Sequence, residues 1–202
     1  MGEHYFSETP SSAHEVHTFS IPYRGKAVTF ETDAGVFSKG HLDTGTAMLL
    51  EVLPEAFAGR MLDLGCGWGA VGVCAASAWK DAKIALTDIN ERAVALAKAN
   101  LARNGLTATV AQGDGLASVE GMFDLIALNP PIRAGKAVIY RLFEEAAERL
   151  CPGGSLYIVI RKQQGADSAA KFLKGLFPRV EIVSRGGGGF RVIRGTLASA
   201  GS

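Results

Sequence analysis

From residue 60 onward, the 202-residue chain alternates between short apolar segments and longer segments whose apolar residues recur at helical spacing. We expect strands at 61–64, 84–87, 108–111, 124–128, 155–160, 180–183 and 190–197, and helices at 69–79, 91–103, 136–150 and 167–175. Alternation with short links is typical of a mainly parallel sheet covered by helices on both faces. The last two strands are joined by little more than four glycines, which leaves no room for a helical crossover, so that pair must be antiparallel. The sequence therefore predicts an α/β fold with a seven-stranded, mostly parallel sheet and one antiparallel strand near the C-terminus.

The residues before position 60 follow a different pattern. Residues 1–15 are polar and are expected to form a loosely held tail. Two segments of alternating apolar and polar residues, 16–21 and 26–31, are separated by a proline- and glycine-containing link, which predicts a β-hairpin. We therefore expect residues 1–34 to be an N-terminal tail and hairpin, attached to one domain that spans residues 35–202.

The cysteines and the apolar segments limit the kinds of site and compartment. Cys66, Cys74 and Cys151 form no Cys-x-x-Cys pair and have no histidine at metal-ligand spacing, so we expect neither a disulfide framework nor a bound metal. No apolar run approaches the ~20 residues that cross a bilayer, and residues 1–20 lack the core of a signal peptide. The sequence predicts a cytoplasmic protein with no metal and no membrane partner.

Charge is unevenly distributed although the formal net charge is only +1. Residues 1–100 contain 8 Lys and Arg against 12 Asp and Glu, whereas residues 101–202 contain 13 against 8. Nine of those 13 bases are arginine, the side chain best suited to two-pronged contacts with phosphate. The bias agrees with an RNA partner and equally with an ordinary solvated surface.

A glycine-rich loop, Gly65-Cys66-Gly67-Trp68-Gly69, follows the first core strand. Its three glycines allow a tight turn and a close approach of the backbone to a ligand at a helix N-terminus. The spacing also fits a dinucleotide-binding fingerprint. Asp63 distinguishes the two readings, because a nicotinamide cofactor would place its pyrophosphate in this loop, where a carboxylate repels it. A cationic ligand group would instead be attracted.

Two further acids follow the next two strands. Asp88, followed by Ile89, ends the second strand, where a carboxylate can accept the hydroxyl protons of a ribose. Asp114, followed by Gly115, comes after the third strand and is placed to accept from an adenine amino group. Each acid taken alone can be a helix cap. Three acids at successive strand ends lie on the edge where open sheets bind ligands.

The glycine loop and the three acids together resemble the class I S-adenosylmethionine-dependent methyltransferases, over about residues 35–197. The resemblance implies a Rossmann-like sheet and S-adenosyl-L-methionine as the cofactor. It implies that the loop and Asp63 hold the methionine part, Asp88 the ribose and Asp114 the adenine. From these elements we expect the cofactor to contact Asp63, Gly65, Cys66, Gly67, Gly69, Asp88, Ile89, Asp114 and Gly115.

The tetrapeptide Asn129-Pro130-Pro131-Ile132 directly follows an apolar strand. Two prolines cannot continue a central strand or enter a helix interior, so they predict a stiff, extended loop at the ligand edge. An exocyclic amine is a poor nucleophile, because its lone pair is delocalised into the ring. The Asn129 side-chain oxygen and the Pro130 carbonyl can accept its two protons and aim the nitrogen at a sulfonium methyl group. The alternative is a turn capped by asparagine. We predict Asn129, Pro130 and Pro131 as catalytic residues, with Asn129 also beside the cofactor.

Residues 35–46 and 129–136 together resemble the small methyltransferase domain of the ribosomal RNA guanine-N2 methyltransferases. The resemblance implies transfer of a methyl group to the exocyclic amine of a guanine in small-subunit (16S) ribosomal RNA, with that RNA or the small ribosomal subunit as partner. It also implies that the segment of residues 37–46, where Asp43 or Thr44 is expected to cap a helix, covers the methionine end of the cofactor. The residues concerned are Asp43, Thr44 and Gly45.

Substrate contacts are expected from residues that flank these motifs: Phe37, Ile132, Arg133, Lys136 and Lys162. Better-known members of the family carry a second, degenerate copy of the domain at the N-terminus. This chain has only about sixty residues before its first core strand, so we expect it to lack that copy. Substrate selection should then differ, and a homodimer is one way to supply it.

Three other functions stay open on the sequence alone. The same chemistry can act on adenine N6 or on a protein glutamine, although such flat targets are usually met by an aromatic residue where this chain has Ile132. The fold can also serve as a non-catalytic RNA-binding or partner-binding module, although such a module has no need for the three acids and Asn129. Asp63 disfavours an NAD-dependent dehydrogenase.

Overall fold

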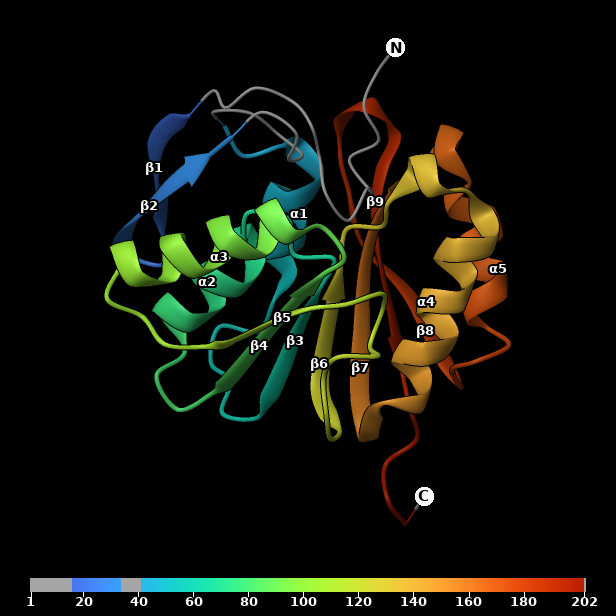
Figure 1. Ribbon diagram of the computed structural model, residues 1–202. Coiled ribbons are helices and arrows are strands. Elements are labelled where there is room, and N and C mark those ends of the chain that lie inside the picture. Colours follow the sequence, from blue (N-terminus) through green and yellow to red (C-terminus); the bar gives the residue numbers. More distant parts are fainter. Residues whose placement is uncertain (1–15, 34–40, 202) are drawn as a thin grey trace.

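The computed structural model describes residues 16–33 and 41–201 (Figure 1). The expected tail, the segment 34–40 and its predicted substrate residue Phe37 lie outside the described residues.

A seven-stranded sheet forms the centre of the molecule, with the strand order β5-β4-β3-β6-β7-β9-β8. β9 runs antiparallel to both of its neighbours, whereas the other paired strands of this sheet are parallel. The predicted Rossmann-like α/β sheet, with its antiparallel strand near the C-terminus, is confirmed. The strands are β3 (Arg60–Leu64), β4 (Lys83–Asp88), β5 (Thr109–Gln112), β6 (Phe123–Leu128), β7 (Leu150–Arg161), β8 (Arg179–Arg185) and β9 (Phe190–Thr196).

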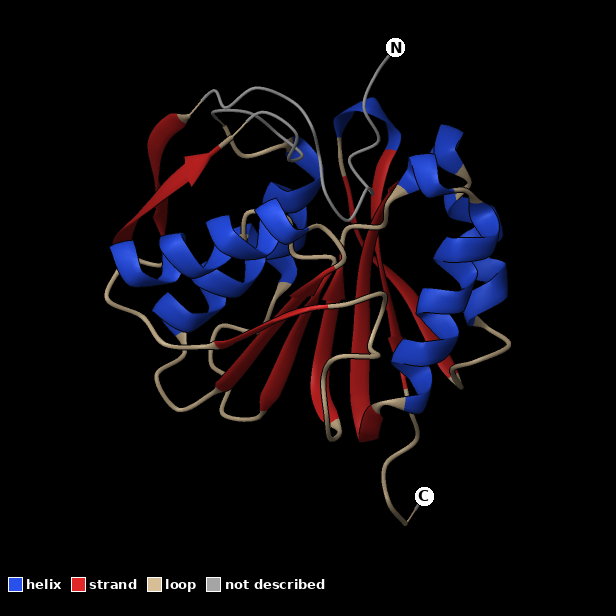
Figure 2. Ribbon diagram, viewed as in Figure 1, coloured by secondary structure: helices blue, strands red, loops and turns tan. Residues whose placement is uncertain are grey.

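Helices cover both faces of this sheet, so the core has two layers (Figure 2). Leu49 and Val73 lie in one layer, and Phe143 and Leu173 lie in the other, all four completely buried. No helix in the described ranges is long and apolar enough to cross a membrane. The first layer contains α1 (Thr44–Val52), α2 (Ala70–Ala78) and α3 (Glu91–Arg103), and the second contains α4 (Lys136–Glu148) and α5 (Ala166–Leu173).

The largest difference from the predicted boundaries lies between α4 and β7. The helix expected at 136–150 ends at Glu148, and the strand expected at 155–160 already begins at Leu150. Leu150 pairs with Phe123 at the start of β6, ahead of a register shift between the two strands. Because Leu150 also continues the apolar spacing of the helix, periodicity cannot mark this boundary.

The strand order brings the carboxyl ends of β3, β4 and β6 together at the middle of one sheet edge. The chain moves outward from β3 to β4 and β5, and then returns to form β6 on the other side of β3. At such a reversal the loops after neighbouring strands diverge, and open α/β sheets bind ligands there. Asp63, Asp88 and Asn129 come from these three strand ends.

The predicted N-terminal hairpin is confirmed and consists of β1 (His17–Tyr23) and β2 (Lys26–Thr32). Trp68 of the glycine loop contacts Phe19 and Phe30 of the hairpin, with ring centroids 5.6 and 4.8 Å away. Trp68 is therefore part of the core beneath the hairpin. The domain boundary between residues 34 and 35 stays a prediction.

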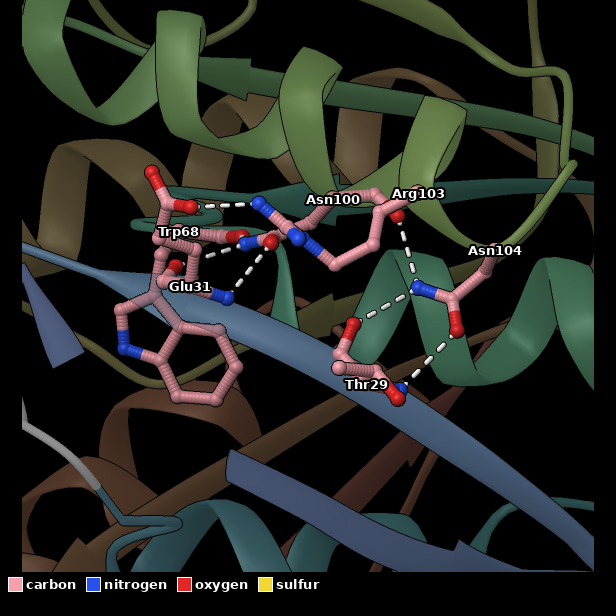
Figure 3. Close-up of polar contacts among 6 residues, drawn as sticks. All are labelled: Thr29, Glu31, Trp68, Asn100, Arg103 and Asn104. Carbon is pink, nitrogen blue, oxygen red and sulfur yellow. Dashed lines mark hydrogen bonds and ion pairs between the residues drawn. The ribbon is translucent and has the colours of Figure 1, made fainter. Parts of the chain in front are cut away.

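Asn100 of α3 and Asn104, the C-cap of that helix, complete the hydrogen bonding of β2, as Figure 3 shows. Asn100 accepts from the Glu31 N–H (2.7 Å) and donates to the carbonyls of Glu31 (2.9 Å) and Trp68 (2.8 Å). Asn104 accepts from the Thr29 N–H (2.9 Å) and donates to the Thr29 carbonyl (2.8 Å). An edge strand otherwise presents such groups unpaired. The two amides take the place of a third strand, and Asn100 joins the hairpin to the glycine loop.

Replacing Asn100 by alanine should lower the free energy of unfolding by about 2–4 kcal/mol, because it leaves three backbone groups without their partner around a fully buried position. Urea unfolding measures the change. The exposed Lys98 of the same helix provides the control, since Lys98→Ala should change stability by less than about 0.5 kcal/mol. A loss at Asn100 no larger than that of the control would contradict the bridging role.

Candidate active site

The glycine loop presents its backbone at the start of α2. Gly65 and Gly67 have φ values of +67° and +54°, and a Cβ on Gly67 would meet nothing within 4 Å. Gly69 packs closely on α3, because a Cβ there would lie 3.2 Å from the Ala97 Cβ. The loop is fixed from below by the Cys66 N–H, which donates to the Thr87 carbonyl (2.9 Å). The chain thus leaves open space in front of Gly67, as close approach of a ligand requires.

Asp63 is a buried acid at the end of β3, with only 3% of the residue exposed. Burial raises the pKa of its carboxyl to about 7, and the nearby Asp88 carboxylate adds to this rise, while a hydrogen bond from the Gly72 N–H (2.7 Å) opposes it. Within the described ranges Asp63 has no ion-pair partner. A cationic ligand group beside it would favour its charged form.

Cys66 is buried in the same loop. Burial, together with the Asp63 and Asp88 carboxylates, raises the pKa of its thiol well above the usual range. The thiol therefore stays protonated at neutral pH and is no nucleophile. Its contribution to the loop is the backbone bond to Thr87.

Asp88 organises the loop from the neighbouring strand end. Its two carboxylate oxygens accept from the N–H groups of Gly67 (2.8 Å) and Asn90 (2.9 Å). Burial raises the pKa of this carboxyl, although these hydrogen bonds oppose the rise. Ile89 follows it half-buried, and the Ile89 carbonyl accepts from the Gln112 side chain (3.2 Å). Each oxygen of an ionised carboxylate can accept more than one hydrogen bond, so Asp88 can still accept from ligand hydroxyls.

Asp114 lies on the more exposed side of this edge. Its side chain is 59% exposed and forms an ion pair with Arg141 of α4 (2.7 Å), which also binds Glu145 (2.5 Å). Glu145 in turn accepts from the Leu116 N–H (3.1 Å) and fills the space beside Gly115, where a Cβ would lie 2.1 Å from its carboxylate. In this arrangement Asp114 faces an arginine. Its contact with adenine stays a prediction.

Asn129 connects the loop after β6 to the first turn of α1. The Asn129 Nδ2 donates to the hydroxyl of Thr46 (3.0 Å), which itself lies 2.5 Å from an Asp43 carboxylate oxygen. Pro130 behind it is buried, and Pro131 is the N-cap of a short 3-10 helix, Ile132–Ala134. The structure thus brings Asn129 together with Asp43, a residue 86 positions earlier in the chain (129 − 43).

Thr46 lies in the segment that the sequence places near the cofactor, but its contact with Asn129 was not predicted. Asp43 is the N-cap of α1, with its carboxylate accepting from the Thr46 N–H (3.0 Å). Of its neighbours, Thr44 is exposed at the first helical position, and Gly45 leaves room for Phe190, whose ring would lie 3.0 Å from a Cβ there. A hydroxyl three residues after a capping aspartate is the signal that could have pointed to Thr46.

The predicted substrate residues fall into two groups. Ile132 packs against the core layer of α4 and α5, Arg133 is exposed beside it, and the Lys136 ammonium lies 5.0 Å from the centre of the Tyr140 ring. Lys162 belongs to another element, the 3-10 helix after β7. The first group flanks Asn129 in the chain, and Lys162 lies at the end of the next strand along the edge.

No group of three or more metal-ligating side chains occurs within the described ranges. The groups gathered around the glycine loop are instead a buried acid with no ion-pair partner among the described residues, a carboxylate that can accept from hydroxyls, and a backbone with open space before it. This set suits a ligand that joins a cation to a nucleoside.

A sheet of this topology, with a glycine loop after its first strand and acids at the next strand ends, defines a class I S-adenosylmethionine-dependent methyltransferase. The chain belongs to the methyltransferase small domain family, whose model matches residues 27–194. S-adenosylmethionine is accordingly the cofactor, and the donor set around the glycine loop fits it.

Proteins similar to this chain include one of about the same length and others about twice as long. The chain is 44% identical over 189 residues to uncharacterized protein YbxB of Bacillus subtilis (strain 168), covering 92% of this chain and 94% of that one. It is 34% identical over 185 residues to the Ribosomal RNA small subunit methyltransferase C of Pseudomonas entomophila (strain L48), covering 88% and 54%. A solved structure of the T. thermophilus 16S rRNA N2 G1207 methyltransferase, in complex with AdoMet and guanosine, matches with a TM-score of 0.80 at 27% identity, covering 93% and 52%. The chain thus spans about half the length of these ribosomal RNA methyltransferases.

Asp63 should make the stability of the cofactor-free protein depend on pH. Its pKa is about 7 in the folded protein, against 3.8 for an ordinary aspartate exposed to water as in the unfolded chain, so the folded state holds an extra proton between these values. The stabilisation linked to that proton is present below about pH 4 and is lost as pH rises to about 7. Urea unfolding should therefore show Asp63→Asn gaining stability relative to the parent protein across this range, by about 1–4 kcal/mol. Parallel pH profiles for the two proteins would contradict the assignment.

Proposed function

We propose that the protein transfers a methyl group from S-adenosylmethionine to the exocyclic N2 amine of a guanine in small-subunit ribosomal RNA. Support comes from the relatives named for this RNA and from the structural match whose partner is an N2 guanine methyltransferase in complex with guanosine. Because those proteins are about twice as long as this chain, the choice of nucleotide does not carry over with the fold.

The observation that carries the proposal is the setting of Asn129. Its amide nitrogen is occupied by Thr46, and the two prolines after it hold the loop in one conformation. An amide whose nitrogen is bound in this way has its oxygen free to accept a proton from a substrate. The Pro130 carbonyl is the second acceptor in the proposal, so that the two N–H groups of one amine are held together.

S-adenosylmethionine supplies an electrophilic methyl group on a sulfonium centre. In the proposal Asp63 lies beside the cationic methionine end, Gly65 and Gly67 allow the backbone to approach it, and Asp88 accepts from the ribose hydroxyls. Asn129 orients the amine for in-line attack, and positioning of this kind can contribute about 7–11 kcal/mol to lowering a reaction barrier. The amine loses its proton after transfer, so no side chain has to be a strong base.

An RNA substrate is supported by cations at the same sheet edge. Arg185 and Arg191 lie opposite each other on β8 and β9, and Arg161 ends β7 with its guanidinium 4.3 Å from the centre of the Phe190 ring. Lys162 is exposed next to the turn between β8 and β9. None of these four cations forms an ion pair with another described residue. Cations without an ion-pair partner at the sheet edge that carries the Asn129 loop favour a polyanionic substrate.

Labelled cofactor tests the proposal directly. The protein is incubated with methyl-labelled S-adenosylmethionine and naked 16S rRNA, small subunits or whole ribosomes, and the RNA is then digested to nucleosides. The proposal predicts label in N2-methylguanosine. Label in N6-methyladenosine or in protein would replace the proposed acceptor by an alternative one, and absence of transfer to every substrate would contradict the proposal.

Asn129→Ala should lower the rate of methyl transfer by at least about 100-fold, because it removes the acceptor that positions the amine. Calorimetry with S-adenosylhomocysteine should show cofactor affinity within a few-fold of the parent value, since Asp63 and Asp88 are untouched. An unchanged rate would refute the role of Asn129.

The double substitution Lys162→Ala, Arg185→Ala should weaken the salt dependence of RNA binding. Each lost phosphate contact on single-stranded RNA reduces the slope of log K against log salt by about 0.7. Filter binding of a single-stranded RNA oligonucleotide at about 50 to 200 mM KCl measures the slope. Lys80→Ala, Lys83→Ala removes the same charge from exposed positions before and at the start of β4, at the opposite edge of the sheet, and is the control. Equal slopes for both double variants would contradict an RNA path along this edge.

A further inference from the structure

The first turn of α1 contains a directional chain of hydrogen bonds that ends at Asn129. Thr46 is buried, with 5% of the residue exposed, so its hydroxyl is shielded from water. Three bonds meet at this residue: its N–H donates to Asp43 (3.0 Å), its hydroxyl lies 2.5 Å from the other Asp43 oxygen, and the Asn129 Nδ2 lies 3.0 Å from the same hydroxyl.

The direction of each bond follows from what the groups can donate. An ionised carboxylate only accepts, so the single proton of the Thr46 hydroxyl must go to Asp43. The hydroxyl oxygen then has only lone pairs to offer Asn129. An amide can satisfy such an acceptor only through its NH₂ group, and this turns the amide oxygen to the opposite side.

We propose that Thr46 is a positioning residue that fixes the orientation of the Asn129 amide and so presents its oxygen to the substrate amine. The inference rests on the proposed function. Without the hydroxyl, the amide could rotate by half a turn and turn its NH₂ group toward the substrate. The N–H groups of Asn129 and those of the substrate amine would then repel each other. Asp43 acts through Thr46, because its charge sets the direction of the whole chain.

Removal of the hydroxyl is the first test. Thr46→Val keeps the shape of the side chain and should lower kcat about 10- to 100-fold, with binding of S-adenosylhomocysteine unchanged within about twofold. Thr46→Ser retains the hydroxyl and should restore most of the lost kcat. Thr109→Val makes the same chemical change at an exposed position of β5 and is the control.

Reversal of the chain is the second test, and it leaves the helix cap in place. In Asp43→Asn the side-chain oxygen still accepts from the Thr46 N–H, because asparagine caps helices as well as aspartate does. Its NH₂ group then faces the Thr46 hydroxyl and donates to it. The hydroxyl proton must turn to Asn129, which now has to present its oxygen inward. Asp43→Asn should therefore lower kcat as Thr46→Val does, with little change in thermal stability.

Coupling separates positioning from a purely structural role. In an Asn129→Ala background there is no amide left to orient, so Thr46→Val should cause less than about a twofold further loss in single-turnover rate. A structural role would cause the same loss in both backgrounds.

The outcomes also separate this inference from the proposed function. Full kcat in both Thr46→Val and Asp43→Asn, with Asn129→Ala inactive, would overturn the positioning role and leave the proposed function standing. Weakened S-adenosylhomocysteine binding by Asp43→Asn at unchanged kcat would likewise overturn it, in favour of a direct cofactor contact. Full activity in Asn129→Ala would overturn the role of Asn129 and, with it, this inference, whereas absence of transfer by the parent protein to every substrate would overturn the proposed function.

Discussion

The hydrogen bond between Asn129 and Thr46 joins two parts of the candidate site that lie 83 positions apart in the chain. One part is the rigid proline loop after β6, and the other is the capped first turn of α1. Neither part alone defines the orientation of the amide, since prolines fix the backbone but leave the side-chain torsions free. Through the direction of this bond, the helix cap Asp43 also determines which way the Asn129 side-chain oxygen, the proposed acceptor, points. The proposed chemistry depends on that direction, because an amine can be held only by groups that accept.

The cofactor half of the site is organised by a different force. Asp63 is buried and has no ion-pair partner in the part of the chain that the structure describes, and the rise of its pKa reflects an unfavourable burial that a cationic ligand relieves. Asp88 holds the loop through the Gly67 N–H, while Asn100 holds it through the Trp68 carbonyl. The loop is thus fixed from the sheet and from the N-terminal hairpin, which makes the hairpin a structural support of the cofactor site.

The architecture could be predicted from the sequence because it depends on local patterns. The spacing of apolar residues and the short glycine link predict the strands and helices of the sheet. Because the carboxyl ends of parallel strands meet at one edge, the same pattern places the acids together there. The predicted end of α4 lies two residues too late, because Leu150 continues the apolar spacing of the helix although it is the first residue of β7. The contact of Thr46 was missed for another reason: its partner Asn129 lies 83 positions away in the chain, and no periodicity reports a contact of that kind. Likewise, nothing in the pattern showed that Asp114 pairs with Arg141.

A crystal structure with S-adenosylhomocysteine and guanosine bound is the most direct test of the account. We expect the guanosine N2 to lie within about 2.7–3.2 Å of the Asn129 side-chain oxygen. The amide nitrogen should still donate to the Thr46 hydroxyl, and the Pro130 carbonyl should be the second acceptor. A guanosine amine bound away from this loop, or an Asn129 amide whose nitrogen faces the base, would contradict it.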